Sequence, residues 1–102
     1  MKFDATLTTT GKSAVITVRG TLDENSEGEF QQHVERAAEL DIAELVIDMT
    51  GLNELTAMGV RSVAYSCQRM PDDVQLVIIS PAGQVREALL AADFMDGVAI
   101  RG

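Results

Sequence analysis

The side chains best suited to nucleophilic or metal chemistry are few in this sequence, and they are not clustered. His33 is the only histidine and Cys67 the only cysteine. A catalytic histidine needs a nucleophile and an orienting group nearby, and a zinc site needs several thiolate or imidazole ligands. We interpret His33 as a surface residue without a role and Cys67, on an apolar helical stripe, as a core thiol. The sequence predicts no catalytic residue and no metal site.

Carboxylates are abundant, with 16 Asp and Glu residues and a formal net charge of −8. A chain this acidic lacks the basic patch that binds nucleic acid or an anionic membrane surface, so neither is expected as a direct partner. Asp72 and Asp73 follow a helix end and are interpreted as turn residues. Asp23 and Asp48, expected at or just past strand ends, either cap neighbouring N–H groups or border a partner site. Solvation of the surface explains most of the others.

Length and composition predict one soluble domain over residues 1–102. Hydrophobic residues make up 46% of the 102 residues, which is typical of a folded chain with one modest core. A single cysteine excludes an internal disulfide and favours a reducing compartment. The start of the chain has no apolar signal core, and no run reaches the roughly 20 residues that span a bilayer. A cytoplasmic location is therefore expected. The glycines match no phosphate-binding spacing, so no cofactor is expected and an enzyme is not predicted.

Hydrophobic periodicity predicts the order β-β-α-β-α-β-α-β. Alternating or continuous apolar runs indicate strands, and apolar residues three and four apart indicate helices. The first two strands form a hairpin, and the strand–helix–strand units imply parallel pairing with right-handed crossovers. The predicted fold is α/β, a mixed four- to five-stranded sheet with helices mainly on one face. Strands are expected at residues 3–8, 14–18, 44–48, 75–79 and 98–100, and helices at about 26–40, 56–70 and 80–92.

Local signals predict where two of these helices begin. Ser26, followed three residues later by Glu29, has the pattern of a capping box. Ser80 before Pro81 is typical of an N-cap followed by a first helical residue. Residues 19–23 are expected to leave the sheet between the second strand and the first helix.

The stretch from Asp48 to Arg61 is the part of the sequence that is most informative about function. A buried strand is expected to end there, to turn at Thr50-Gly51 and to enter a helix capped by Thr56. The start of a helix leaves free backbone N–H groups that suit a hydroxyl, a phosphate or a partner's carboxylate. The exposed first turn nevertheless carries Ala57 and Met58, which do no chemistry. We interpret the stretch as a recognition surface.

The outer face of the second helix carries the strongest compositional signal for protein binding. Met, Tyr and Arg are enriched at protein interfaces, and residues three and four apart share a helix face. The residues expected on this outer face are Met58, Arg61, Ser62, Tyr65 and Arg69.

Several short strings, in order and spacing, resemble the STAS domain of bacterial anti-sigma factor antagonists over almost the whole chain. The resemblance rests on Gly20-Thr21-Leu22-Asp23, the run from Leu45 to Leu52, Gly59-Val60-Arg61, the run from Val77 to Pro81, and Val85-Arg86. It implies a regulatory protein that binds an anti-sigma factor, a serine kinase of the histidine-kinase-like ATPase fold, and thereby frees a sigma factor.

In the family that this chain resembles, a serine at the start of the second helix is phosphorylated, and the phosphate abolishes kinase binding. By position the phosphoacceptor falls on Ala57, which has no hydroxyl. Ala57 is therefore either natural or a substitution that holds the binding-competent state, and a phosphatase would be a partner only if residue 57 were a serine. Thr56 carries a hydroxyl but is expected to cap the helix.

The resemblance and the composition together give the expected partner surface. It comprises Asp23, Thr56, Ala57, Met58, Gly59, Arg61, Ser62 and Tyr65. The alternative function is a STAS scaffold subunit of a larger complex, such as a lipid-transport ABC assembly or a stressosome-like particle.

Overall fold

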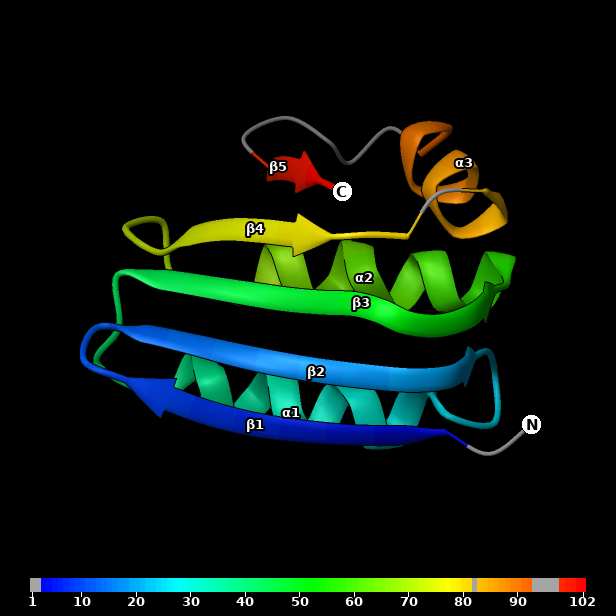
Figure 1. The fold of residues 1–102 in the computed structure, drawn as a ribbon. Coiled ribbons are helices and arrows are strands. Elements are labelled where there is room, and N and C mark those ends of the chain that lie inside the picture. Colours follow the sequence, from blue (N-terminus) through cyan, green and yellow to red (C-terminus); the bar gives the residue numbers. More distant parts are fainter. Residues whose placement is uncertain (1–2, 82, 93–97) are drawn as a thin grey trace.

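A computed structural model describes residues 3–81, 83–92 and 98–102 (Figure 1). The predicted order of strands and helices and the α/β class are confirmed. The elements are β1 (Asp4–Thr10), β2 (Ser13–Leu22), α1 (Glu27–Ala38), β3 (Glu44–Leu55), α2 (Ala57–Arg69), β4 (Gln75–Ile79), α3 (Gln84–Leu90) and β5 (Val98–Arg101).

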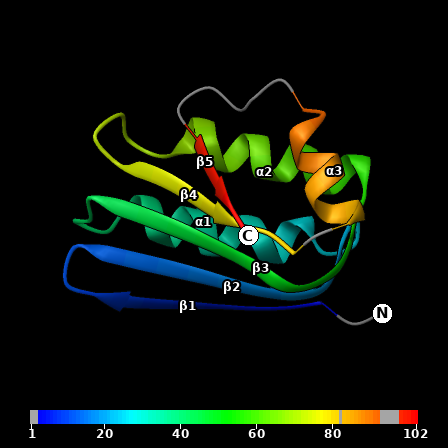
Figure 2. The same cartoon turned by 45° about the horizontal axis from the view of Figure 1, so that its top comes forward.

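One five-stranded sheet, ordered β1-β2-β3-β4-β5, organises the fold. β1 and β2 pair antiparallel across a tight turn in which Gly11 has a positive φ of 59°, a conformation that glycine adopts without strain. The other neighbours pair in parallel. Parallel neighbours require crossover helices, and right-handed crossovers along one direction place every helix on the same face. Figures 1 and 2 show α1 and α2 together behind the sheet.

The core lies between the helices and the face of the sheet that they cover. Along β2 and β3 buried and half-buried residues alternate, because successive side chains of a strand point to opposite faces. Ile16 and Ile47 from the strands meet Phe30 and Val63 from the helices, and all four are fully buried. Each such side chain contributes about 1.5–3 kcal/mol to folding.

The strands β2 and β3 are longer than the sequence suggested. The expected turn at Thr50-Gly51 is wrong, and of residues 19–23, which were expected to leave the sheet, only Asp23 does so. β2 and β3 stay paired to Leu22 and Leu55 through two register shifts. At Gly51 a Cβ would lie 2.8 Å from Cγ of Arg19, so a larger residue there would require the arginine side chain to shift.

The predicted start of the first helix at Ser26 is confirmed but its capping box does not form, and the predicted start of the third helix at Ser80 is wrong. Ser26 precedes α1 but makes no side-chain cap bond. Its hydroxyl instead donates to the carbonyl of Thr21 (2.8 Å) and accepts from the N–H of Asp23 (2.9 Å). Ser80 directly follows β4, and its N–H donates to the carbonyl of Arg101 on β5 (2.8 Å). α3 begins only after Gly83, whose φ is 94°.

Candidate partner-binding site

A single residue, Thr56, connects the end of β3 to the start of α2. Its backbone is extended, and its side-chain oxygen accepts from the N–H of Gly59 at 3.2 Å. The predicted N-cap is therefore confirmed. The N–H of Thr56 (3.2 Å) and its hydroxyl (3.3 Å) both donate to the carbonyl of Leu22. These bonds fix the corner between β3 and α2 to the end of β2.

Gly59 allows the first turn of α2 to pack directly on the backbone of β2. A Cβ at this position would lie 2.3 Å from the carbonyl oxygen of Leu22 and 2.7 Å from Cδ1 of Leu55. Contacts this short do not occur between real atoms, so any side chain would force the helix away from the sheet. Gly59 is buried and supports the corner without presenting a side chain at its surface.

Ala57 and Met58 form the outer surface of the same turn. Ala57 is exposed, Met58 is half-buried and lies outside the core cluster, and the first turn of α2 holds no acidic residue. An approaching molecule can therefore reach residue 57 and meets no negative charge from the turn itself. We name this surface, Thr56 to Gly59, the α2 corner.

The two aspartates singled out in the sequence form local turns. In Asp23, Oδ1 accepts from the N–H of Asn25 (2.9 Å) and from the hydroxyl of Ser26 (3.2 Å). In Asp48, Oδ1 accepts from the N–H (3.0 Å) and the hydroxyl (2.7 Å) of Thr50. Asp23 follows Leu22 and so lies beside the α2 corner. Asp48 lies within β3, so its expected place at a strand end is wrong.

Ser62 does not lie on the outer face of α2, and that prediction is wrong. Its side chain is buried, and its hydroxyl donates to Oε2 of Glu27 (3.2 Å) and to the carbonyl of Met58 (3.3 Å). The reason is that α1 packs beside α2 and covers this position. Arg61, one residue earlier, is exposed.

Tyr65 and Arg69 are held by α1 through one carboxylate. The hydroxyl of Tyr65 donates to Glu35 in a short hydrogen bond, and Nε of Arg69 donates to Oε1 of Glu35 at 2.8 Å. Donation by Tyr65 lowers the pKa of Glu35, and the same bond raises the pKa of Tyr65. Tyr65 thus keeps an exposed ring while its polar end is already engaged within the chain.

Gln84, on α3, was not identified from the sequence. Its side-chain amide binds both backbone groups of Leu55: Oε1 accepts from the N–H at 3.0 Å and Nε2 donates to the carbonyl at 2.8 Å. Leu55 ends β3 and precedes Thr56. A polar residue at an exposed helix start gives no signal of such a contact, which only the tertiary fold creates.

Cys67 and His33 are the remaining side chains that could act as a nucleophile or a metal ligand. Burial raises the pKa of the Cys67 thiol to about 11, so the thiol is protonated at neutral pH and a poor nucleophile. His33 is half-buried rather than on the surface as expected, and its Nδ1 has no hydrogen-bond partner among the described residues. No group of three or more His, Cys, Asp or Glu side chains that could hold a metal occurs in residues 3–81, 83–92 and 98–102.

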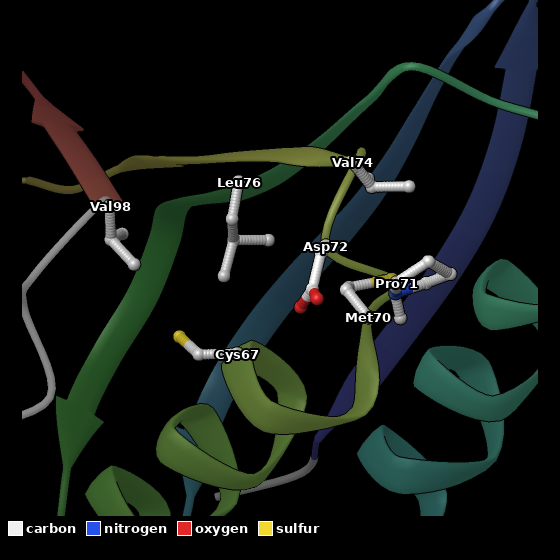
Figure 3. A pocket seen from close by; sticks show the side chains of 7 residues that line it. All are labelled: Cys67, Met70, Pro71, Asp72, Val74, Leu76 and Val98. Atoms are coloured by element: carbon white, nitrogen blue, oxygen red, sulfur yellow. The ribbon is translucent and has the colours of Figure 1, made fainter.

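A small cavity of about 180 Å³ lies at the other end of α2 (Figure 3). Its lining comes from the end of α2, the following turn and the starts of β4 and β5. It gathers one thiol and one carboxylate among apolar side chains, which is too little for catalysis. The lining residues are Cys67, Met70, Pro71, Asp72, Val74, Leu76 and Val98.

Comparison with known proteins places this fold in a family. A family model described as STAS domain matches residues 4–101. The chain belongs to the STAS domain family. No significant match was found among curated protein sequences.

Solved structures of anti-sigma factor antagonists share this STAS fold. The crystal structure of an anti-sigma factor antagonist from Mycobacterium paratuberculosis superposes with a TM-score of 0.90 at 13% identity, covering 98% of this chain and 86% of that one. The anti-sigma factor antagonist SpoIIAA in its unphosphorylated form gives a TM-score of 0.73 at 15% identity, covering 97% and 88%.

The same fold also occurs inside a much larger protein. The murine anion transporter solute carrier 26 family member A9 gives a TM-score of 0.72 at 18% identity, covering 89% of this chain but 16% of the transporter. In the described part of the present chain, no helix has the length and apolarity needed to cross a membrane.

Proposed function

We propose that this STAS protein is a regulatory binding module of the anti-sigma factor antagonist type, and that its α2 corner contacts the partner. The observation that carries the proposal is the exposure of Ala57 at the first position of α2, in a turn without an acidic residue. The corner is also rigidly built, because Thr56 and Gly59 tie it to the end of β2. A rigid, uncharged surface loses little entropy on binding.

A negative charge at residue 57 would regulate partner binding at this surface. A phosphate there would add about −1.5 to −2 charge at the start of a helix. The helix dipole tolerates this charge, whereas a partner packed on Met58 would have to bury it without compensation. Ala57 has no hydroxyl and stays uncharged. The hydroxyl of Thr56 is occupied by the cap and by Leu22.

The partner expected from this proposal is an anti-sigma factor, a serine kinase of the histidine-kinase-like ATPase fold, in the cytoplasm. Side chains available to it are those of Ala57, Met58, Arg61 and the ring of Tyr65, with Asp23 at the border. Gly59 and Ser62 are buried, so in this proposal they support the contact surface from inside the chain and do not touch the partner. The proposed activity is binding, and the chain is not an enzyme.

The direct test introduces a negative charge at the α2 corner. Capture from a host lysate with the native chain identifies the kinase, and calorimetry with the purified kinase then compares Ala57→Asp with the native chain. Affinity is expected to fall at least about tenfold, or about 1.4 kcal/mol. Unchanged affinity would contradict the proposal.

Gly28→Asp is the matched control. It adds the same charge to the first turn of α1, where a Cβ would meet nothing within 4 Å. Kinase affinity is expected to remain unchanged, because this turn lies outside the proposed contact. Both variants should retain the native unfolding temperature within a few degrees, since both charges lie at helix starts.

A scaffold subunit is the second candidate function. Two observations favour it: residue 57 has no hydroxyl, and the same fold forms a small part of an anion transporter. In that case the native chain and the Ala57→Ser variant would capture the same partner, a transporter subunit or a large particle. Phosphosite mapping of Ala57→Ser after incubation in host lysate separates the two functions, because only a kinase partner would modify the introduced serine.

A further inference from the structure

The outer edge of β1 is a row of backbone hydrogen-bonding groups that no described element covers. β1 is the first strand in the order of the sheet. Figures 1 and 2 both show it at the margin of the sheet, with α1 packed on its face and not along its edge. A strand in this position presents N–H and C=O groups that can pair with another chain. We name this margin, Asp4 to Thr10, the β1 edge.

The hairpin determines which backbone groups point outward. Thr10 pairs with Ser13 across a two-residue turn, and the pair that closes such a turn is hydrogen-bonded. Bonded and non-bonded pairs alternate along an antiparallel ladder. The even-numbered residues of β1 therefore bond to β2, and the odd-numbered ones turn their backbone groups outward. In the described part of the chain no hydrogen bond engages these outward groups, which belong to Ala5, Leu7 and Thr9.

The β1 edge lacks the features that commonly prevent edge strands from pairing, which are lysine, proline and β-bulges. The strand contains neither residue, and its register with β2 is continuous over all seven residues. Its only charged residue, Asp4, lies at one end beside Arg19 of β2. The edge is therefore regular and nearly uncharged, although the whole chain has a formal charge of −8.

We propose that two copies of this chain pair antiparallel along their β1 edges, about a two-fold axis that passes beside Leu7 and is perpendicular to the sheet. Full overlap of the two strands places Leu7 opposite Leu7 of the second copy, and Ala5 opposite Thr9. Each of these pairs exchanges two backbone hydrogen bonds. The contact joins the two five-stranded sheets into one, and it is isologous, the commonest form of association between identical chains.

The side chains of β1 are compatible with this register on both faces of the sheet. On the face away from the helices, Thr6 lies opposite Thr8 of the second copy, a favourable cross-strand pair. Asp4 lies opposite Thr10, so the two carboxylates do not meet. On the helix face, Leu7 is half-buried and packs against the core. Its two copies meet at the axis and connect the two cores.

The layer of helices also continues across the axis. α1 contacts both β1 and β2, so its axis lies over the space between them. With strands about 4.8 Å apart, the two α1 axes would lie about 10 Å apart, a usual packing distance for helices. Glu27 and Glu35 bind residues of α2, so the exposed Glu29 and Arg36 lie on the opposite side of α1. The two-fold axis makes the helices antiparallel and brings Glu29 of one copy toward Arg36 of the other.

The proposed contact is complete with two copies. The outer strand that remains on each copy is β5, with four residues, and short edge strands resist further pairing. α2 lies on the side of α1 away from β1 (Figure 1), so the α2 corner stays free in the dimer. One pair of strands and one pair of helices form less than the roughly 800 Å² per partner of a standard interface. Association should therefore be reversible and dependent on concentration.

Paired lysines test the register. In the double variant Thr6→Lys, Thr8→Lys each new lysine lies opposite a lysine of the second copy, and like charges directly opposite are destabilising. Association should be at least about tenfold weaker than in the native chain. An equimolar mixture with the double variant Thr6→Glu, Thr8→Glu forms oppositely charged pairs and should dimerise again. Sedimentation velocity from about 10 µM to about 1 mM covers the affinities of weak complexes.

Thr10→Lys is the matched control. It makes the same change in the same strand and on the same face, but the register places the lysine opposite Asp4 of the second copy. Association should be at least as tight as in the native chain. A general effect of net charge would strengthen every lysine variant, because the native chain is acidic. Opposite outcomes for Thr10→Lys and the double lysine variant therefore identify the register.

Hydrogen exchange in the native chain tests the same contact without a substitution. The amide protons of Leu7 and Thr9 are bonded only in the dimer, so NMR should show their exchange slowing as the concentration rises. The amide protons of Thr6 and Thr8 bond to β2 in both states and should change little. This measurement applies even if the double variants fail to fold.

A native chain that stays monomeric throughout would overturn the proposal. So would a double lysine variant that is folded by circular dichroism and dimerises as tightly as the native chain. Exchange at Leu7 and Thr9 that does not depend on concentration would overturn it as well. The same holds if the β1 edge pairs with an extended peptide of another protein while the chain alone stays monomeric.

Discussion

The chain turns from strand to helix at two neighbouring corners, and the two are built differently. After β2, four residues lead to α1, and the hydroxyl of Ser26 binds the turn itself. After β3, Thr56 alone leads to α2, and its side chain caps the helix. Acidic residues occupy the first turn of α1, and none occupies the first turn of α2.

The two first turns also differ in their glycines. Gly28 in α1 has open space around it, whereas Gly59 in α2 packs on the carbonyl of Leu22. The first corner is thus charged, locally hydrogen-bonded and open at its glycine, and the second is uncharged and tightly packed at its glycine. Surfaces that must present a constant shape to a partner are expected to be of the second kind.

Gly59→Ala is expected to have the largest effect on this comparison. The added methyl group would overlap the backbone of β2, and relief requires movement of α2. The free energy of unfolding should fall by about 3 kcal/mol or more, at the upper end of the cost of overpacking. Urea unfolding followed by circular dichroism measures it. A loss below about 1 kcal/mol would show that the corner is not tightly packed.

Ser26→Ala tests the locally satisfied corner. Its removal leaves the buried carbonyl of Thr21 and the N–H of Asp23 without this partner, which should cost about 1–3 kcal/mol. The same urea titration gives the value. An effect of a few tenths of a kcal/mol would mean that water replaces the hydroxyl.

Gln84→Ala tests whether α3 supports the second corner. Both backbone groups of Leu55 lose their partner, but Gln84 is exposed, so water can replace part of the contact. A loss of about 1–2 kcal/mol is expected. Gln68→Ala, at an exposed position of α2, changes the same residue type in a helix and should be nearly neutral. Equal effects in the two variants would argue against the clamp.

Thr56→Ala removes the helix cap and should cost about 1 kcal/mol. Thr56→Ser keeps the oxygen and should cost much less. Thermal unfolding of the three proteins provides the comparison, and a difference between Ala and Ser is the diagnostic result. If both substitutions behave alike, the cap contributes little and the methyl group of Thr56 matters more.

Gly28→Ala should have the smallest effect, and in the opposite direction. Gly28 sits in a helix with no atom near a future Cβ, so alanine should stabilise the chain by about 0.5–1 kcal/mol. Opposite signs of the stability change in Gly28→Ala and Gly59→Ala would be the clearest evidence that the two corners are packed differently. Destabilisation by Gly28→Ala would show that α1 begins under a constraint comparable to that on α2.

The order of elements and the cap at Thr56 could be predicted from the sequence because they depend on local periodicity and local chemistry. The extension of β2 and β3 could not. Gly51 and its polar neighbours look like a loop, but Gly51 pairs with Arg19 of β2, a long-range contact that the local sequence does not reveal.

The missing capping box at Ser26 and the wrong helix start at Ser80 have a similar origin. Ser26 and Ser80 both precede helical periodicity, but tertiary partners take their hydrogen-bonding groups: Thr21 in the first case and Arg101 in the second. Ser62 was misplaced because the sequence does not reveal which side of α2 faces α1. The clamp from Gln84 joins residues 29 positions apart, a separation at which local patterns carry no information.

The strands of this sheet stand side by side in the order in which they occur along the chain. During synthesis on the ribosome, each strand would therefore emerge when the edge it must join already exists. No segment has to be threaded between two earlier ones, and the closure cost at each step is that of one crossover. A nascent chain can thus extend the sheet by adding each new strand next to the strand that preceded it in the sequence.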